Sequence, residues 1–205
     1  MKLKLYADRM SQPSRAVLIF CSHAILQYLA SAFPGVADHW YPADLFKRAK
    51  INSVLDWHHS NLRRGAAPLV LNKALAPALG LPLNPKAAAE AEIILSASLA
   101  KIESFWLKGN GRFLLGSLQP SIADLSLVCE IMQLEVLDDE VRARILGPHK
   151  KVIKWIDDTR NATQPHFDEM HAILFKAKEK LLKMHSDAGS DQTESSRKPA
   201  LPSKI

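Results

Sequence analysis

Apolar residues recur at helical spacing along most of this chain. Between residues 44 and 183 they stand three or four positions apart, which is typical of helices that pack one face on a core. Proline, glycine and capping residues divide the pattern into segments. The sequence therefore predicts helices over residues 44–72, 85–108, 121–137, 141–146, 150–162 and 167–183, with Pro68 kinking or ending the first.

The helix predicted after Asn84 has clear boundaries. Asn84 is a favourable N-cap, Pro85 suits the first helical position, and Gly109 suits the C-terminal end. We expect its core-facing stripe to consist of Ile93, Leu95, Leu99, Ile102, Phe105 and Trp106.

The N-terminal segment follows a different pattern. Alternating residues over 3–6 predict a short strand, and residues 16–37 carry no formal charge. Between them, Ser11 and Gln12 precede Pro13, which suits the start of a helix. A thiolate would be stabilised there, because a helix N-terminus carries partial positive charge and a serine hydroxyl can donate a hydrogen bond to sulfur. A capped helix start without further function is the alternative interpretation.

The uncharged segment also has features of a signal peptide or membrane span. Basic residues precede it, and Ala30-Ser31-Ala32 has the small-x-small pattern of a cleavage site. Polar residues interrupt the apolar run, however, and they favour a helix of a soluble protein: Ser22, His23, Gln27 and Tyr28. We therefore do not expect membrane insertion.

Composition excludes several other classes of protein. The 205 residues are 47% hydrophobic, enough for one helical core. The net charge of +6 is scattered along helices, so no nucleic-acid partner is expected. Cys21 and Cys129 lie in apolar runs and indicate buried free thiols. No metal site is predicted, because neither His58 with His59 nor His166 with His171 has the i, i+4 spacing and intervening glutamate of zinc hydrolases.

Ser121 and Asp124 form the pattern of a capping box at the start of an apolar helix. We assign Asp124 to structure, because its carboxylate should accept hydrogen bonds from backbone donors at the helix start. Its loss is expected to cost about 1 kcal/mol.

Taken together, these motifs resemble the plant theta-class glutathione transferases over almost the whole chain. The segments that carry the resemblance are 11–16, 39–42, 55–59, 62–64, 119–125, 151–155, 165–167 and 203–205. The resemblance implies a homodimeric enzyme that conjugates glutathione to hydrophobic electrophiles and reduces organic hydroperoxides. Glutathione is then a co-substrate, and no cofactor is expected.

The resemblance also implies roles for particular residues. Ser11 would activate the glutathione thiol, and Gln12 and Ser22 would help to bind glutathione. Arg63 or Arg64 would project towards the electrophile pocket or the subunit interface, and a surface arginine pair is the alternative interpretation.

The chain departs from the family pattern where Phe20-Cys21 runs directly into Ser22-His23. The family's thioredoxin-like domain has further strands, a cis-proline turn and a glutamate before the serine, and these have no counterpart here. We interpret the join as an internal deletion, a splice product or an erroneous gene model, and expect glutathione to bind no tighter than millimolar. The alternative function is a non-catalytic helical protein that binds hydrophobic ligands or pairs with intact subunits.

The expected fold is therefore mainly α: a glutathione-transferase C-terminal helical bundle with a remnant of a thioredoxin-like domain, namely one strand and a fused first and third helix. The predicted divisions are the remnant at 1–33, a linker at 34–42, the helical domain at 43–185 and a disordered tail at 186–205. Ser203-Lys204-Ile205 is similar to a peroxisomal targeting tripeptide, so we expect the peroxisome first, the cytosol second and secretory membranes third.

Overall fold

The computed structural model describes residues 23–195, and this part of the chain is helical and contains no strand. The strand predicted over residues 3–6 and the first part of the fused helix lie outside the described residues. The main helices are α2 (His23–Ala32), α3 (Leu45–Ser60), α4 (Leu62–Val70), α5 (Pro85–Lys101), α6 (Ile122–Ile131), α7 (Asp139–Leu146), α8 (Lys150–Ala162) and α9 (His166–Ser195). Shorter helical turns are η1 (Asp38–Trp40), η2 (Leu71–Leu75), η3 (Ala76–Leu79), η4 (Ile102–Trp106), η5 (Leu114–Gly116) and η6 (Met132–Val136).

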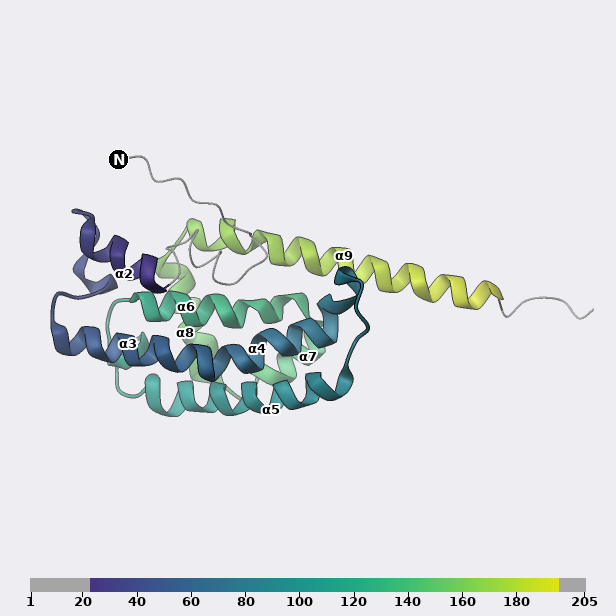
Figure 1. Ribbon diagram of the computed structural model, residues 1–205, viewed down its shortest axis with the longest axis horizontal. Coiled ribbons are helices and arrows are strands. Elements are labelled where there is room, and N and C mark those ends of the chain that lie inside the picture. Colours follow the sequence, from purple (N-terminus) through teal and green to yellow (C-terminus); the bar gives the residue numbers. More distant parts are fainter. Residues whose placement is uncertain (1–22, 196–205) are drawn as a thin grey trace, which may run out of the picture.

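The helix α6 is the centre of the bundle. Its N-cap Ser121 and its Asp124 form the predicted capping box, and every residue from Ile122 to Ile131 is buried. Figure 1 shows α3 and α4 almost in line beside α6, with α5 along their other side. Also in contact with α6 are α2 and α8. The predicted helix over 150–162 is confirmed as α8, and Asn84 caps α5 as expected.

The close approach of α4 to α5 depends on one glycine. A Cβ atom at Gly65 would lie 2.5 Å from the backbone nitrogen of Leu95. No side chain fits there, so glycine allows the two helices to pack backbone against backbone.

The sequence predicts that Pro68 kinks or ends the first long helix, but the helix does not end at Pro68. The break lies at Asn61, whose backbone is non-helical (φ −126°, ψ −78°). Its backbone N–H and its side-chain amide both donate to the Trp57 carbonyl, at 3.1 and 3.0 Å. Pro68 lies inside α4, and the chain continues as the wider turn η2, a π-helix. The Asn72 side-chain amide donates a hydrogen bond to the Pro68 carbonyl at 2.8 Å.

Two residues of the predicted core stripe face solvent instead. Leu95, Leu99 and Ile102 are buried as predicted, whereas Ile93 is 72% and Phe105 52% exposed. Ile93 lies about 200° around the helix from Leu95, so both cannot face the core. The π-helical turn η4 shifts the register at Phe105 and leaves Trp106 as the buried aromatic residue.

The last helix is longer than the sequence predicts. A disordered tail is expected from residue 186, but α9 continues to Ser195. No proline interrupts residues 186–195, since the next prolines are Pro199 and Pro202. Across residues 23–195, no helix combines the length and the apolar character that crossing a membrane requires.

Candidate functional site

The residues that the sequence assigns to glutathione lie outside the described residues. These are Ser11, Gln12 and Ser22, together with Cys21. The first described residue, His23, directly follows Ser22 and begins α2. The surroundings of the α2 N-terminus are therefore the described region nearest in sequence to the predicted glutathione site.

The helix α2 is held against the bundle by one apolar anchor and a small polar network. Leu26 is fully buried. The Gln27 side-chain amide donates to Oδ1 of Asn52 on α3 at 3.0 Å, and the Tyr41 hydroxyl donates to the same oxygen at 3.0 Å. These contacts bring the start of α2 next to the C-terminal half of α3.

Three histidine rings meet at this junction. The ring of His23 lies 5.4 Å from that of His58 and 4.7 Å from that of His59, measured between centroids. One nitrogen of each ring lies within 4.8 Å of the others. His58 is buried, His23 is half-buried and His59 is exposed, so the cluster spans from the core to the surface.

A buried carboxylate contacts one ring of the histidine cluster. Glu130 on α6 is fully buried, and its Oε2 atom lies 3.3 Å from Nε2 of His58 and 3.4 Å from Nη1 of Arg63. Among the described residues, Nδ1 of His58 and Oε1 of Glu130 have no hydrogen-bond partner. The histidine ring is thus oriented through one nitrogen, while its other nitrogen remains available.

The surroundings favour the neutral form of His23 and of His59. Burial lowers the pKa of His23 to about 4, and the nearby His58, His59 and Arg63 lower it further in the same direction. Burial also lowers the pKa of His59, with contributions from His58 and Arg63. A neutral imidazole keeps a lone pair on one ring nitrogen, which is the form that binds metals.

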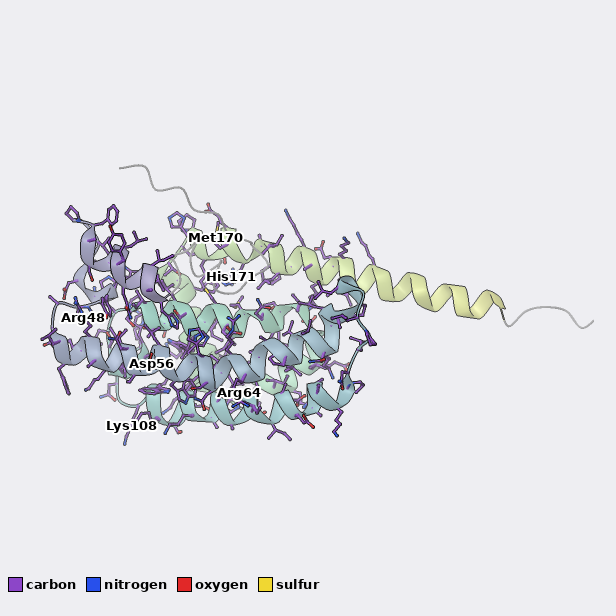
Figure 2. All side chains as sticks on the ribbon, viewed as in Figure 1. Arg48, Asp56, Arg64, Lys108, Met170 and His171 are labelled. Atoms are coloured by element: carbon purple, nitrogen blue, oxygen red, sulfur yellow. The ribbon has the colours of Figure 1, made fainter. Side chains whose placement is uncertain are left out.

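The two arginines that the sequence singles out take different positions. Arg63 turns towards α6 and pairs with Glu130, whereas Arg64 is exposed on α4 (Figure 2). Within the described part of the chain, Arg64 forms no ion pair. Arg63 is therefore fixed by the core, and Arg64 is free to contact a ligand or another protein.

Asp124 has more partners than a capping box supplies. Its Oδ2 accepts hydrogen bonds from the backbone N–H and hydroxyl of Ser121, at 2.8 and 2.9 Å. Its Oδ1 accepts from the backbone N–H of Leu114 at 2.9 Å and from Nε1 of Trp155 at 2.8 Å. Burial raises the pKa of Asp124, and these four donors oppose that rise. The structural role predicted for Asp124 is confirmed, and it joins α6 to a loop and to α8.

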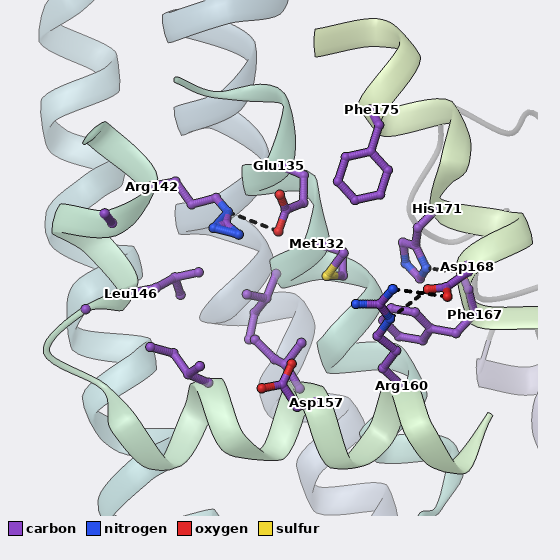
Figure 3. A pocket seen from close by; sticks show the side chains of 15 residues that line it. Met132, Glu135, Arg142, Leu146, Asp157, Arg160, Phe167, Asp168, His171 and Phe175 are labelled. Carbon is purple, nitrogen blue, oxygen red and sulfur yellow. Dashed lines mark hydrogen bonds and ion pairs between the residues drawn. The ribbon is translucent and has the colours of Figure 1, made fainter. Parts of the chain in front are cut away.

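A cavity of about 510 Å³ lies among η6, α7, α8 and α9 (Figure 3). Its wall contains apolar side chains from all four elements, among them Met132, Leu146, Ile156, Phe167 and Phe175. A volume of this size is typical of sites for small organic ligands.

Two ion pairs border the cavity, as Figure 3 shows. Arg142 pairs with Glu135 at 3.0 Å, and Arg160 donates two hydrogen bonds to Asp168, at 2.7 and 3.1 Å. Burial raises the pKa of Glu135, although Arg142 and Lys178 lower it. An apolar floor with charged groups at its border suits an amphipathic compound.

Sequence reasoning missed most of these residues. Glu130 had a detectable signal, because it is the one acidic residue between Leu125 and Ile131 in an otherwise apolar run, and such a charge is expected to be paired. The meeting of His23 with His58 had no such signal, since the two residues are far apart in sequence. The cavity residues come from separate helices and have no common motif.

No protein-family model matches the chain. Glutathione S-transferase T1 of Arabidopsis thaliana is 57% identical to it over 250 residues, with 100% of both chains covered. Glutathione S-transferase T3 of the same plant is 55% identical over 250 residues, which cover 100% of this chain and 41% of that longer relative.

Solved structures with the same fold include theta-class glutathione transferases. The apo form of human glutathione S-transferase T1-1 superposes with a TM-score of 0.74 at 27% identity, covering 85% of this chain and 90% of that one. A human theta-class glutathione transferase in complex with the glutathione conjugate of 1-menaphthyl sulfate has a TM-score of 0.77 at 25% identity, covering 90% of this chain and 92% of that one.

Proposed function

This chain belongs to the theta-class glutathione S-transferases, and from that premise we propose that it derives from an enzyme that conjugates glutathione to electrophiles, with a glutathione site weakened by an internal deletion. The observation that carries the proposal is the identity of 57% over the whole chain. The human relative that binds a glutathione conjugate shares the helical fold and supports the proposed reaction.

The length of the alignment supports the deletion. Glutathione S-transferase T1 is aligned over 250 residues, whereas this chain has 205, so part of the relative has no counterpart here. The sequence pattern puts the join at Cys21 and Ser22, where the family motif loses its glutamate. Comparing the gene with its transcript tests this: an exon absent from the transcript at this point supports splicing, and an uninterrupted coding sequence across it refutes splicing.

In the proposed mechanism, the Ser11 hydroxyl donates a hydrogen bond to the glutathione sulfur and lowers the pKa of the thiol. The thiolate attacks an electrophilic carbon or reduces an organic hydroperoxide. Gln12 and Ser22 contribute to glutathione binding, and Arg64 is free to face the electrophile. Several lost hydrogen bonds, each worth about 1.5–3 kcal/mol for charged groups, would reduce glutathione affinity to the millimolar range or weaker.

Calorimetry and conjugation assays on the full-length protein test this mechanism. We expect weak glutathione binding and slow conjugation, both lost in Ser11→Ala and retained in the control Ser14→Ala, which changes a second serine of the same motif. Equal residual activity in wild type and Ser11→Ala would remove the proposed role of Ser11. Micromolar binding lost in Ser11→Ala would show that the site is intact and would refute the impairment.

The cavity favours a second candidate function, the binding of hydrophobic ligands without catalysis. Its volume and apolar wall fit an amphipathic compound such as anilinonaphthalene sulfonate. Met132→Trp should fill the cavity and reduce binding of this dye, whereas Phe46→Ala, which removes an exposed ring on α3, should not. Unchanged dye binding in Met132→Trp would refute the cavity as the ligand site.

Two further properties are proposed from the sequence. The chain forms homodimers or pairs with intact subunits of its family, which analytical ultracentrifugation tests. Ser203-Lys204-Ile205 directs it to peroxisomes. A fluorescent protein fused in front of the chain should label peroxisomes and become diffuse once these three residues are removed; labelling that survives the truncation would exclude the tripeptide as an address.

A further inference from the structure

We propose that His23, His58 and His59 form a binding site for a divalent transition-metal ion of the Zn²⁺ type. The three rings come from two helices and gather with one nitrogen each within 4.8 Å of the others. Neither the conjugation reaction nor the glutathione site requires this arrangement.

The donor set suits such an ion. Imidazole nitrogen binds Zn²⁺, Co²⁺, Ni²⁺ and Cu²⁺, and three histidines with a water in the fourth position form a tetrahedral zinc site. Because His59 is exposed, solvent can supply that water. The site is therefore expected to hold one ion with one open coordination position.

Glu130 provides the support that metal-binding histidines usually have. A ligating histidine commonly donates its second ring N–H to a carboxylate, which fixes the orientation of the ring. Nε2 of His58 lies 3.3 Å from Glu130, and Nδ1 of His58 has no partner among the described residues. His58 therefore binds the ion through Nδ1, and Glu130 acts as a positioning residue.

The charge balance permits a cation here. Arg63 lies close enough to lower the pKa of both His23 and His59, so its guanidinium also opposes a metal ion. Its charge is offset by Glu130, whose carboxylate it contacts at 3.4 Å.

Binding requires a small contraction of the cluster. Zn–N distances of about 2.0–2.1 Å put the nitrogens of a tetrahedral site about 3.4 Å apart. The half-buried His23 and the exposed His59 would have to rotate towards the buried His58. The bound ion would then join α2 to α3.

Calorimetric titration of the full-length protein with Zn²⁺ alone tests the proposal. We expect one ion per chain, and at least a tenfold loss of affinity in both His23→Ala and His59→Ala. His166→Ala is the matched control, because it removes an exposed histidine on α9 that pairs with Glu169, and it should bind as wild type does. Circular dichroism confirms that each variant is folded.

Co²⁺ provides a second measurement that reports geometry. Bound at the three histidines, it should show the strong visible absorption of a tetrahedral site, and Glu130→Gln should weaken binding about 10–100-fold while keeping that spectrum. Zn²⁺ affinity that is the same in wild type, His23→Ala and His59→Ala would overturn the proposal. A weak, octahedral Co²⁺ spectrum in the wild type would overturn it as well.

Discussion

Replacing Asp124 with alanine should destabilise the protein far more than the loss of a helix cap does. The change removes the acceptor of four hydrogen bonds, from the Ser121 N–H, the Ser121 hydroxyl, the Leu114 N–H and the Trp155 indole N–H. All three of these donor residues are buried, so water cannot replace the lost acceptor.

The magnitude follows from the orphaned donors. Each buried donor left without a partner costs about 1–3 kcal/mol, while removal of a buried carboxylate recovers part of its desolvation penalty. The net loss expected for Asp124→Ala is about 4 kcal/mol, a large fraction of the stability of a typical domain. Asp124→Asn keeps one acceptor oxygen but directs an amide at donors, so about 2 kcal/mol is expected.

Urea denaturation followed by circular dichroism measures these differences. Asp138→Ala is the matched control, because Asp138 caps α7 through one hydrogen bond to the Val141 N–H and is exposed. Its loss should cost about 1 kcal/mol. If Asp124→Ala costs no more than Asp138→Ala, the linkage of α6 to the 114 loop and to α8 does not contribute to stability, and the reasoning fails.

Two other changes test separate parts of the structure. Gly65→Ala should destabilise by about 3 kcal/mol, because its Cβ would lie 2.5 Å from the Leu95 backbone and would push α4 from α5; a change below about 0.5 kcal/mol in thermal unfolding would contradict this close approach. Hydrogen bonds from Arg160 hold the pKa of Asp168 below its usual range. The Asp168 carboxylate therefore stabilises the folded protein at pH values above its unfolded pKa of about 3.9. This stabilisation disappears as the pH falls through the lower pKa of the folded state. Asp168→Asn should therefore cost less than about 1 kcal/mol at pH 7, given the solvent exposure of the pair, and nothing at pH 2; a loss that persists at pH 2 would refute the assignment.

Local chemistry explains which elements could be predicted from sequence. Asn84 with Pro85 and Ser121 with Asp124 act within a few residues, and both helix starts are where the sequence indicates. The break at Asn61 was missed because the non-helical backbone of this residue (φ −126°, ψ −78°) interrupts an otherwise ordinary helical pattern of apolar residues. Proline was overestimated as a helix end, since Pro68 lies inside α4 and a π-helical turn follows it.

The candidate sites also differ in whether a short sequence pattern could predict them. Ser11 and Ser22 were identified by motif and remain predictions, because they lie outside the described residues. The histidine cluster was missed because it depends on where the packing of α2 puts His23, which no short-range pattern encodes. The cavity was missed for the same reason, as its lining comes from four separate elements.

The complete enclosure of α6 has a consequence for the dynamics of the protein. A backbone amide exchanges its hydrogen with solvent only when its hydrogen bond opens, and α6 presents no face at which it can open alone. Exchange along α6 should therefore report the opening of the whole bundle, whereas α2, anchored mainly by Leu26, should exchange through local detachment. The two helices thus form an internal pair of reporters, one for global unfolding and one for release of the N-terminal segment from a bundle that stays folded.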